Sequence, residues 1–274
     1  MTLATPEQNK ETYRTLHDAI ISKRFQSGSP IRRHAHRSQY QTIVDLVPAG
    51  ARVLDAGCGE GVLSVELAKK GCTVIGTDIS EPNIAAAKAY AEAEGVADKT
   101  TFSTGDIEHI AFPDKSFDYV VSSHVLEHVP DFVRAAKELN RVGKIRVITA
   151  IPTCLDFGAM VLLGGDKYWA PSRKSLYALP YGFLRVLGAL FTGKEGVNEG
   201  YEGDMTLIHI WRFPWRGKRL MEAGGLKVIE YGGSAVIFPY FPFLLPLGCL
   251  LEKLVWLPGL RNFGYGTTYV CEPK

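Results

Sequence analysis

The sequence predicts an α/β fold: a doubly wound, mostly parallel seven-stranded sheet with helices on both faces and an inserted apolar cap. The first observation is the stretch 52–68, where an apolar strand leads into a glycine-rich turn and then into helical apolar spacing. The second is the alternation of strand-like and helix-like segments as far as residue 152. The third is a return to this pattern after residue 213, which predicts a last strand that closes the sheet.

The elements of this sheet follow in chain order. Strands are expected at 52–56, 73–77, 101–104, 119–122, 145–150, 226–231 and 267–271, and helices at 61–70, 82–94, 131–141 and 214–223. Ser80 precedes Pro82 and is a predicted N-cap. Ligands of such sheets bind beyond the carboxyl ends of the strands. The residues expected at those ends are Asp55, Gly57, Asp78, Asp106 and Ser122.

The glycine loop indicates the kind of ligand. Gly57, Gly59 and Gly61 alternate along the turn, and glycine allows a positive φ or close contact between main chain and ligand. Asp78 ends the second strand, close to the distance at which doubly wound folds place an acid that binds ribose hydroxyls. The spacing differs from the G-x-G-x-x-G of pyrophosphate-binding loops. A nucleoside is therefore the predicted ligand.

Composition limits the function classes. The 274 residues are 46% hydrophobic, which favours one domain with insertions. A net charge of +2 gives no overall field that would recruit nucleic acid. Five scattered cysteines form no C-x-x-C pair and predict a reduced, cytoplasmic setting without a disulfide or zinc framework. The polar first ten residues predict no secretory signal.

The first half of the chain is expected to contain two segments. Residues 1–48 form an N-terminal helical segment with helices at 7–24 and 38–47. Between these helices lies a basic run, 32–37, which either binds phosphate or is a solvated face before the second helix, and the solvated face is the favoured interpretation. Residues 49–152 form the ligand-binding core.

The second half departs from the alternating pattern. Residues 153–212 are a predicted cap insertion, with helices at 157–163 and 175–191 and a polar loop at 192–204. The last segment, 213–274, is predicted to return to the sheet and to carry a second, apolar insertion at 234–260.

Several motifs resemble one enzyme family. In chain order they are 53–61, 76–80, 105–106, 112–121 and 124–129. They resemble the class I S-adenosylmethionine-dependent methyltransferases, in the small-molecule branch that includes the quinone-biosynthesis methyltransferases. The resemblance covers residues 35–152, with a weaker echo at 209–224 and in the last strand. It implies a Rossmann-like methyltransferase fold, S-adenosyl-L-methionine as the methyl donor and S-adenosyl-L-homocysteine as the product.

The resemblance also implies which residues bind the donor. Gly57 and Gly59 would admit its methionine part, Asp55 would orient its ammonium group, Asp78 would hold the ribose diol and Asp106 the adenine amino group. The full implied set is Asp55, Gly57, Cys58, Gly59, Asp78, Ile79, Asp106, Ile107 and Ser122, with Ile107 against the adenine face and Ser122 near the sulfonium.

Three histidines are the candidate catalytic residues. His124 and His128 belong to an H-x-x-E-H pattern also found in zinc proteases, but it follows a strand and no third ligand is obvious, so no metal is predicted. They either face the acceptor or hydrogen-bond the turn. His209 either serves as a general base or is a core histidine. Further candidates near the site are Tyr201, Glu202 and Asp204.

The segment 234–251 is uncharged and rich in aromatic residues, but Pro239, Pro242 and Pro246 disfavour a membrane-spanning helix. It forms either buried cap core or, with 157–163 and 183–191, an apolar mouth or a peripheral membrane contact.

The predicted function is methyl transfer to an oxygen or activated carbon of a small, apolar or lipid-like acceptor. No Asn/Asp-Pro-Pro-Tyr turn follows the fourth strand, which disfavours an exocyclic amine. Two alternatives stay open: a non-catalytic module that binds the same donor, and an NAD-linked oxidoreductase. Acceptor identity and oligomeric state do not follow from the sequence.

Overall fold

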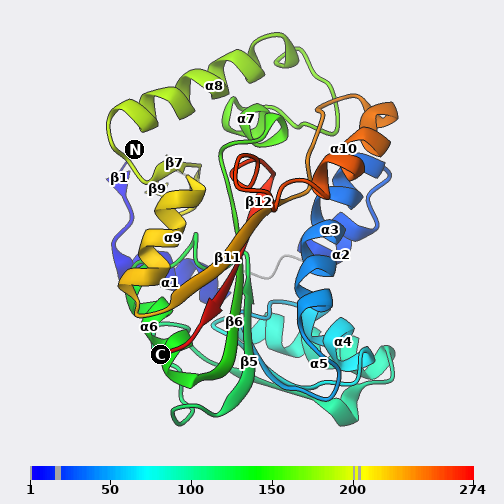
Figure 1. Ribbon diagram of the computed structural model, residues 1–274, viewed down its shortest axis with the longest axis vertical. Helices are drawn as coiled ribbons and strands as arrows, with labels where there is room; N and C mark the ends of the chain where they lie inside the picture. Colours follow the sequence, from blue (N-terminus) through cyan, green and yellow to red (C-terminus); the bar gives the residue numbers. More distant parts are fainter. Residues whose placement is uncertain (1, 16–19, 200, 203–204) are drawn as a thin grey trace.

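A seven-stranded sheet forms the centre of the protein (Figure 1). The computed structural model describes residues 2–15, 20–199, 201–202 and 205–274. The strand order is β11-β12-β6-β5-β2-β3-β4, with β12 antiparallel to both neighbours and the pairs among β2 to β6 all parallel. The strands are β2 (Arg52–Ala56), β3 (Thr73–Asp78), β4 (Thr100–Thr104), β5 (Phe117–Ser123), β6 (Gly143–Pro152), β11 (Lys227–Ser234) and β12 (Gly266–Glu272). The predicted fold class is confirmed.

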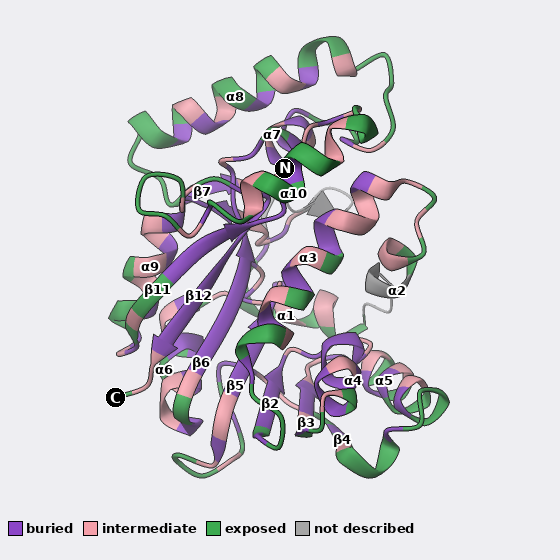
Figure 2. Ribbon diagram, turned by 45° about the vertical axis from the view of Figure 1, so that its right-hand side comes forward, coloured by how far each residue is buried: buried purple, intermediate pink, exposed green. Residues whose placement is uncertain are grey.

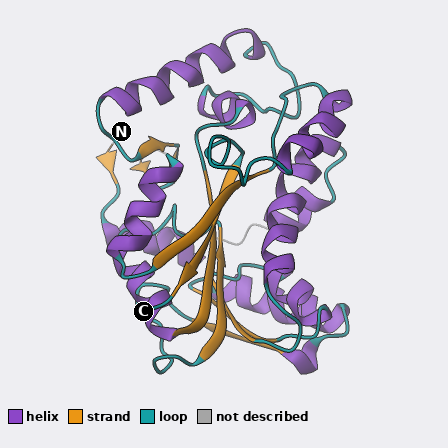
Figure 3. Cartoon of the chain, in the orientation of Figure 1, coloured by secondary structure: helices purple, strands orange, loops and turns teal. Residues whose placement is uncertain are grey.

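Helices cover both faces of this sheet, because alternate strand residues point to opposite sides (Figure 3). Val53 of β2 packs in one hydrophobic cluster with α3 (Pro30–Leu46), α4 (Val62–Lys69) and α5 (Glu81–Ala93). Its neighbour Leu54 packs in the other with α6 (Phe132–Val142) and α9 (Pro214–Ala223). The Ser80 hydroxyl accepts a hydrogen bond from the Asn83 amide at 3.3 Å, which confirms the predicted cap of α5.

The N-terminal segment differs from its prediction. In place of one helix at 7–24, the structure has α1 (Pro6–Thr15) and α2 (Ile20–Phe25), and residues 16–19 lie outside the described chain. Helix α3 begins at Pro30, because the Ser29 hydroxyl caps it. The basic run 32–37 is therefore helical, and His36 within it is buried. Its interpretation as a solvated face before the helix was wrong.

Residues after β6, together with the start of α3, build a third hydrophobic cluster above the sheet edge. It joins α7 (Phe157–Leu163), α8 (Ser175–Phe191) and residues 235–240, with Tyr168 and Phe213 fully buried. The buried Asp156 carboxylate ties two of these segments together, because it accepts hydrogen bonds from the Gly158 amide at 2.7 Å and from the Ile237 amide at 3.0 Å.

The expected polar loop at 192–204 contains strands instead. β7 (Gly196–Asn198) pairs antiparallel with β10 (Ile210–Arg212), and β8 (Tyr201–Glu202) pairs with β9 (Met205–Thr206), which also pairs with β1 (Thr2–Leu3). The segment is polar, yet the buried Trp211 anchors it, and the indole of Trp211 donates a hydrogen bond to Glu199 at 2.9 Å.

Apolar side chains are exposed on α8 and along residues 241–263, which include α10 (Leu245–Glu252). Figure 2 shows exposed residues along α8. The largest exposed fractions are those of Leu176, Phe191 and Phe243, at 90%, 82% and 74%. Among the described helices, none combines the length and the apolar composition that crossing a bilayer requires.

Candidate functional site

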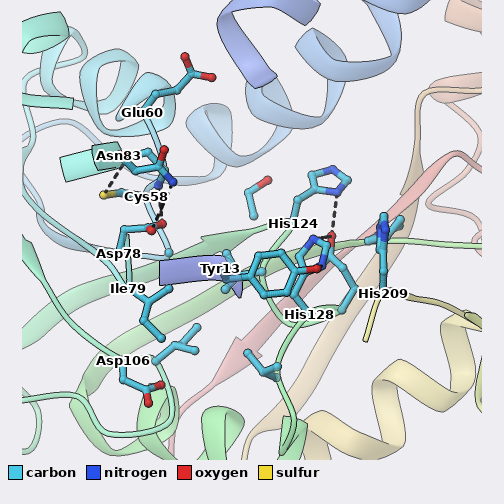
Figure 4. A pocket seen from close by; sticks show the side chains of 18 of the residues that line it. Tyr13, Cys58, Glu60, Asp78, Ile79, Asn83, Asp106, His124, His128 and His209 are labelled. Carbon is cyan, nitrogen blue, oxygen red and sulfur yellow. Dashed lines mark hydrogen bonds and ion pairs between the residues drawn. The ribbon is translucent and has the colours of Figure 1, made fainter. Parts of the chain in front are cut away.

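A cavity of about 400 Å³ opens beyond the carboxyl ends of β2, β3 and β5 (Figure 4). Its floor is the glycine turn 57–61 and the turn 123–130. Its roof includes α1, through Asn9, Lys10 and Tyr13, and its far wall includes His209 and Trp211. The volume is within the usual range for small-molecule sites. Segments from three distant parts of the chain thus enclose one site.

The glycine turn and the end of β3 form the first half of the cavity. Gly57 and Gly59 have φ values of 82° and 52°, a region that favours glycine. The amides of Gly57 and Cys58 both donate to the Thr77 carbonyl, at 2.7 and 2.9 Å. The Asp78 carboxylate accepts hydrogen bonds from the amides of Gly59 and Ser80, each at 2.9 Å. Burial raises the pKa of Asp78.

Asp106 lies at the outer end of this half. Its carboxylate forms an ion pair with the Lys10 ammonium at 2.7 Å, and Lys10 also contacts Glu108. Burial alone would raise the pKa of Asp106, but the bond from Lys10 keeps it below its ordinary value. Ile79 and Ile107 supply apolar wall beside it. This half therefore offers a carboxylate at each end and apolar surface between them.

The other half is built around Glu127, which is only 1% exposed. His124 Nδ1 lies 3.2 Å from Glu127 Oε1. His124 has a φ of 57°, uncommon for a residue other than glycine, and its Nε2 contacts Gln39. The hydrogen bond from His124 lowers the pKa of Glu127, although burial opposes it. The turn is thus held in an unfavourable conformation that aims His124 toward the buried acid.

His128 and His209 adjoin this acid. Their ring centroids are 4.5 Å apart, and His128 Nδ1 lies 2.8 Å from the Tyr13 hydroxyl. The Asn9 side chain donates to the His128 carbonyl and accepts from the Ile208 amide, both at 2.8 Å. Burial lowers the pKa of His209 to about 3 and also lowers that of His128. Both rings are therefore neutral near pH 7.

Most of the residues expected at the site line the cavity, but two do not. Asp55 points inward and accepts the Ser64 hydroxyl at 2.6 Å, and burial raises its pKa to about 7. The Ser122 hydroxyl donates to the Ala56 carbonyl at 2.8 Å, also beneath the surface. Both side chains therefore lie beneath the cavity surface and support it through these hydrogen bonds. The next residue, Ser123, lines the cavity instead. Asp55 and Ser122 were expected to contact the ligand directly, but the structure places them in a supporting position.

Several of the residues that line the cavity were not predicted from the sequence. Asn9, Lys10 and Tyr13 follow helical spacing in a polar segment, a pattern also typical of a solvent-facing helix. His36 belongs to the basic run 32–37, and Glu127 belongs to the H-x-x-E-H pattern, of which only the two histidines were candidates. The side chains of Tyr201 and Glu202, and all of Asp204, lie outside what the structure describes.

Comparison with known families agrees with the observed sheet. A family model described as "Methyltransferase domain" matches residues 54–150. Residues 54–150 are a methyltransferase domain. This stretch includes the glycine turn, Asp78, Asp106 and the turn that carries Glu127.

The methyltransferase domain has curated relatives of two kinds. The chain is 33% identical, over 133 residues, to a ubiquinone biosynthesis O-methyltransferase of Rhizobium etli. This match covers 47% of this chain and 53% of the relative. It is 37% identical over 126 residues to the sterol 24-C-methyltransferase erg6 of Aspergillus fumigatus, which covers 44% and 33%. The chain thus spans about half the length of the O-methyltransferases that it matches.

Solved structures share the fold over nearly the whole chain. The [4+2]-cyclase SpnF has a TM-score of 0.60 at 14% identity, covering 99% of this chain and 98% of that one. Magnesium protoporphyrin IX methyltransferase from Synechocystis, solved with S-adenosylhomocysteine, has a TM-score of 0.54 at 18% identity, with 92% of each chain covered. These similarities show the fold, and a fold by itself does not assign an activity.

Proposed function

We propose that the chain transfers a methyl group from S-adenosylmethionine to an oxygen or an activated carbon of a small, apolar acceptor. The observation that carries this proposal is one cavity with two different halves. One half suits a nucleoside, and the other is rich in histidine. The division into a core, 49–152, and a cap formed by 153–212 and 234–260 is part of the proposal. The cap would supply the wall on the acceptor side.

The first half suits the donor. Gly59 leaves open space where a side chain would begin, so the main chain there is accessible to a ligand. Asp78 would accept hydrogen bonds from the ribose hydroxyls, and Asp106 would lie at the adenine end between Ile79 and Ile107. Cys58 would line the methionine end. The donor supplies an activated methyl group whose leaving group is a neutral thioether.

In the second half, the chain positions the acceptor and receives its proton. Holding the two reactants together in the right geometry supplies a barrier reduction of roughly 7–11 kcal/mol. His124, His128 and His209 all line this half. His124 would take a proton from an acceptor hydroxyl through Nε2, once the acceptor displaces Gln39 from this nitrogen, because Glu127 orients the ring through Nδ1. A buried imidazole with a pKa near 3, such as His209, is a poor proton acceptor by itself.

Labelled donor tests this function directly. We expect the full chain, incubated with methyl-labelled S-adenosylmethionine and a lipid and small-molecule extract, to release S-adenosylhomocysteine and label one apolar product. Identifying that product by mass spectrometry would distinguish oxygen from carbon methylation. Donor binding without any labelled product, across extracts of several organisms, would instead favour the non-catalytic donor-binding module.

The exposed apolar surface of α8 and residues 241–263 leads us to propose contact with an anionic bilayer. Exposed basic residues flank α8: Lys167, Arg173, Lys174 and Lys194. Apolar side chains bordered by cations are typical of surfaces that bind anionic lipid headgroups. Such a surface would place the acceptor side of the protein near a lipid-like substrate.

We expect the chain to float with vesicles containing phosphatidylglycerol, and the double variant Phe241→Ser, Phe243→Ser to float several-fold less. Phe241 and Phe243 are 51% and 74% exposed, so their replacement leaves the core intact. Ile229→Ser is the matched control, because Ile229 is 42% exposed on β11. If the unaltered chain stayed at the bottom of the gradient, bilayer contact would be ruled out.

A further inference from the structure

Three side chains converge at the acceptor end of the cavity. Glu127, His128 and His209 each offer one ligand atom, and these atoms lie within 4.8 Å of one another. Glu127 and His128 come from the turn after β5, whereas His209 immediately precedes β10. The rings of His128 and His209 lie beside each other in the cavity (Figure 4). The main chain fixes this approach, because the Ile210 amide donates to the Glu127 carbonyl at 3.1 Å. The three groups therefore face one another where this main-chain hydrogen bond holds the two segments together.

One oxygen of this cluster is left without a partner. Glu127 Oε1 faces His124 Nδ1, but Oε2 is fully buried and has no hydrogen-bond partner among the described residues. A buried carboxylate oxygen without a hydrogen-bond donor is costly. A cation beside Oε2 would remove this cost.

The ring of His128 is oriented for ligation. The Tyr13 hydroxyl donates to the Ile208 carbonyl at 3.3 Å and can then accept from His128 Nδ1 at 2.8 Å. This arrangement leaves His128 Nε2 as the lone-pair nitrogen, and Nε2 lies on the Glu127 side, 3.8 Å from Oε1. A hydrogen bond at the remote ring nitrogen is the usual support of a metal-binding histidine.

We propose that Glu127, His128 and His209 bind one divalent ion of the Zn²⁺ or Mn²⁺ type. Two imidazoles and one carboxylate leave coordination positions open and suit first-row ions, whereas Mg²⁺ prefers oxygen ligands. Ligand atoms of a tetrahedral Zn²⁺ site lie roughly 3.4 Å apart. Binding therefore requires only small side-chain movements from the 4.8 Å spread.

The ion would deepen the proposed function, on which this role rests. An open position on the ion would take the acceptor hydroxyl, whose O–H bond would then break and release the proton to His124, the proposed proton acceptor. The resulting oxygen anion forms the new O–C bond as the C–S bond of the donor breaks and the electron pair stays on sulfur. The acceptor class is then a hydroxyl compound, with a second oxygen beside the first favouring chelation.

Metal titration of the full, chelator-treated chain tests the site. By calorimetry we expect Zn²⁺ and Mn²⁺ to bind with one-to-one stoichiometry, and Mg²⁺ to bind at least tenfold more weakly. Glu127→Gln and His209→Gln, which keep side-chain size, should each weaken Mn²⁺ binding at least 30-fold. His109→Gln is the matched control, because His109 has a 56% exposed side chain and should leave affinity unchanged. Circular dichroism checks that each variant is folded.

The outcomes separate the two proposals. Equal Mn²⁺ affinity in the folded Glu127→Gln and His209→Gln variants, or no stoichiometric binding to the unaltered chain, would overturn the metal site. Donor binding is measured on the same metal-free sample. A chain that binds S-adenosylmethionine but neither ion contradicts only the metal site, whereas one that binds Mn²⁺ but no donor contradicts the proposed methyl transfer.

Discussion

Asp78→Ala is expected to weaken binding of S-adenosylmethionine about 100-fold. Hydrogen bonds to a charged acceptor contribute about 1.5–3 kcal/mol each, and 1.4 kcal/mol corresponds to a factor of ten in affinity. The substitution removes the proposed ribose contact. It also leaves the amides of Gly59 and Ser80 without the carboxylate that now accepts from both. The glycine turn should therefore lose its shape as well as its ligand contact.

Calorimetric titration of the donor measures this effect. Asp98→Ala provides the matched control, because Asp98 is an exposed aspartate that precedes β4, at the opposite edge of the sheet from Asp78, and this variant should bind the donor normally. Asp78→Asn should fall between the two, since one amide oxygen can still accept one of the two main-chain bonds. Unchanged affinity in folded Asp78→Ala would remove Asp78 from the donor site.

Gly57→Ala is expected to lower donor affinity by a similar factor and to destabilise the fold by about 2–5 kcal/mol. Two costs combine. The residue would have to adopt a φ of 82°, and its Cβ would lie 2.2 Å from Val125 Cγ2. Val125 lies between His124 and Glu127 in the turn 123–130, so the clash should displace this turn along with the glycine turn. Urea unfolding and donor titration measure the two consequences.

Two further variants separate the clash from the backbone strain. Gly95→Ala introduces a side chain at a φ of 69° with nothing within 4 Å, so it should show only the backbone cost of about 1–2 kcal/mol. Adding Val125→Ala to Gly57→Ala removes the two methyl groups nearest to the new Cβ and should restore part of the loss. Without any such recovery, the explanation by steric clash would be wrong.

The sheet could be predicted because its signals are local. Strands such as β2 are short apolar runs that end at glycine or aspartate, and the start of α5 is marked by Ser80 and Pro82 in succession. Spacing for Asp78, and the strand end together with the family resemblance for Asp106, led to two residues that do line the cavity. These signals need no knowledge of which distant segments meet.

The roof and the acceptor half could not be predicted in the same way. Lys10 acquires its role only through contact with Asp106, 96 residues away, and Tyr13 through His128. Asp55 shows the opposite case: its position at a strand end suggested ligand contact, but strand alternation turned it toward Ser64. The cluster of Glu127, His128 and His209 likewise depends on a junction that β10 completes from outside the matched domain.

Helix α1 touches both halves of the cavity at once. Lys10 pairs with Asp106 at the donor end, and Tyr13 bonds His128 at the acceptor end. A ten-residue helix is about 15 Å long and moves as a rigid rod. Loosening it at either end therefore loosens it at the other, so that occupancy of one subsite is communicated mechanically to its neighbour, and the two substrates should show cooperative affinities.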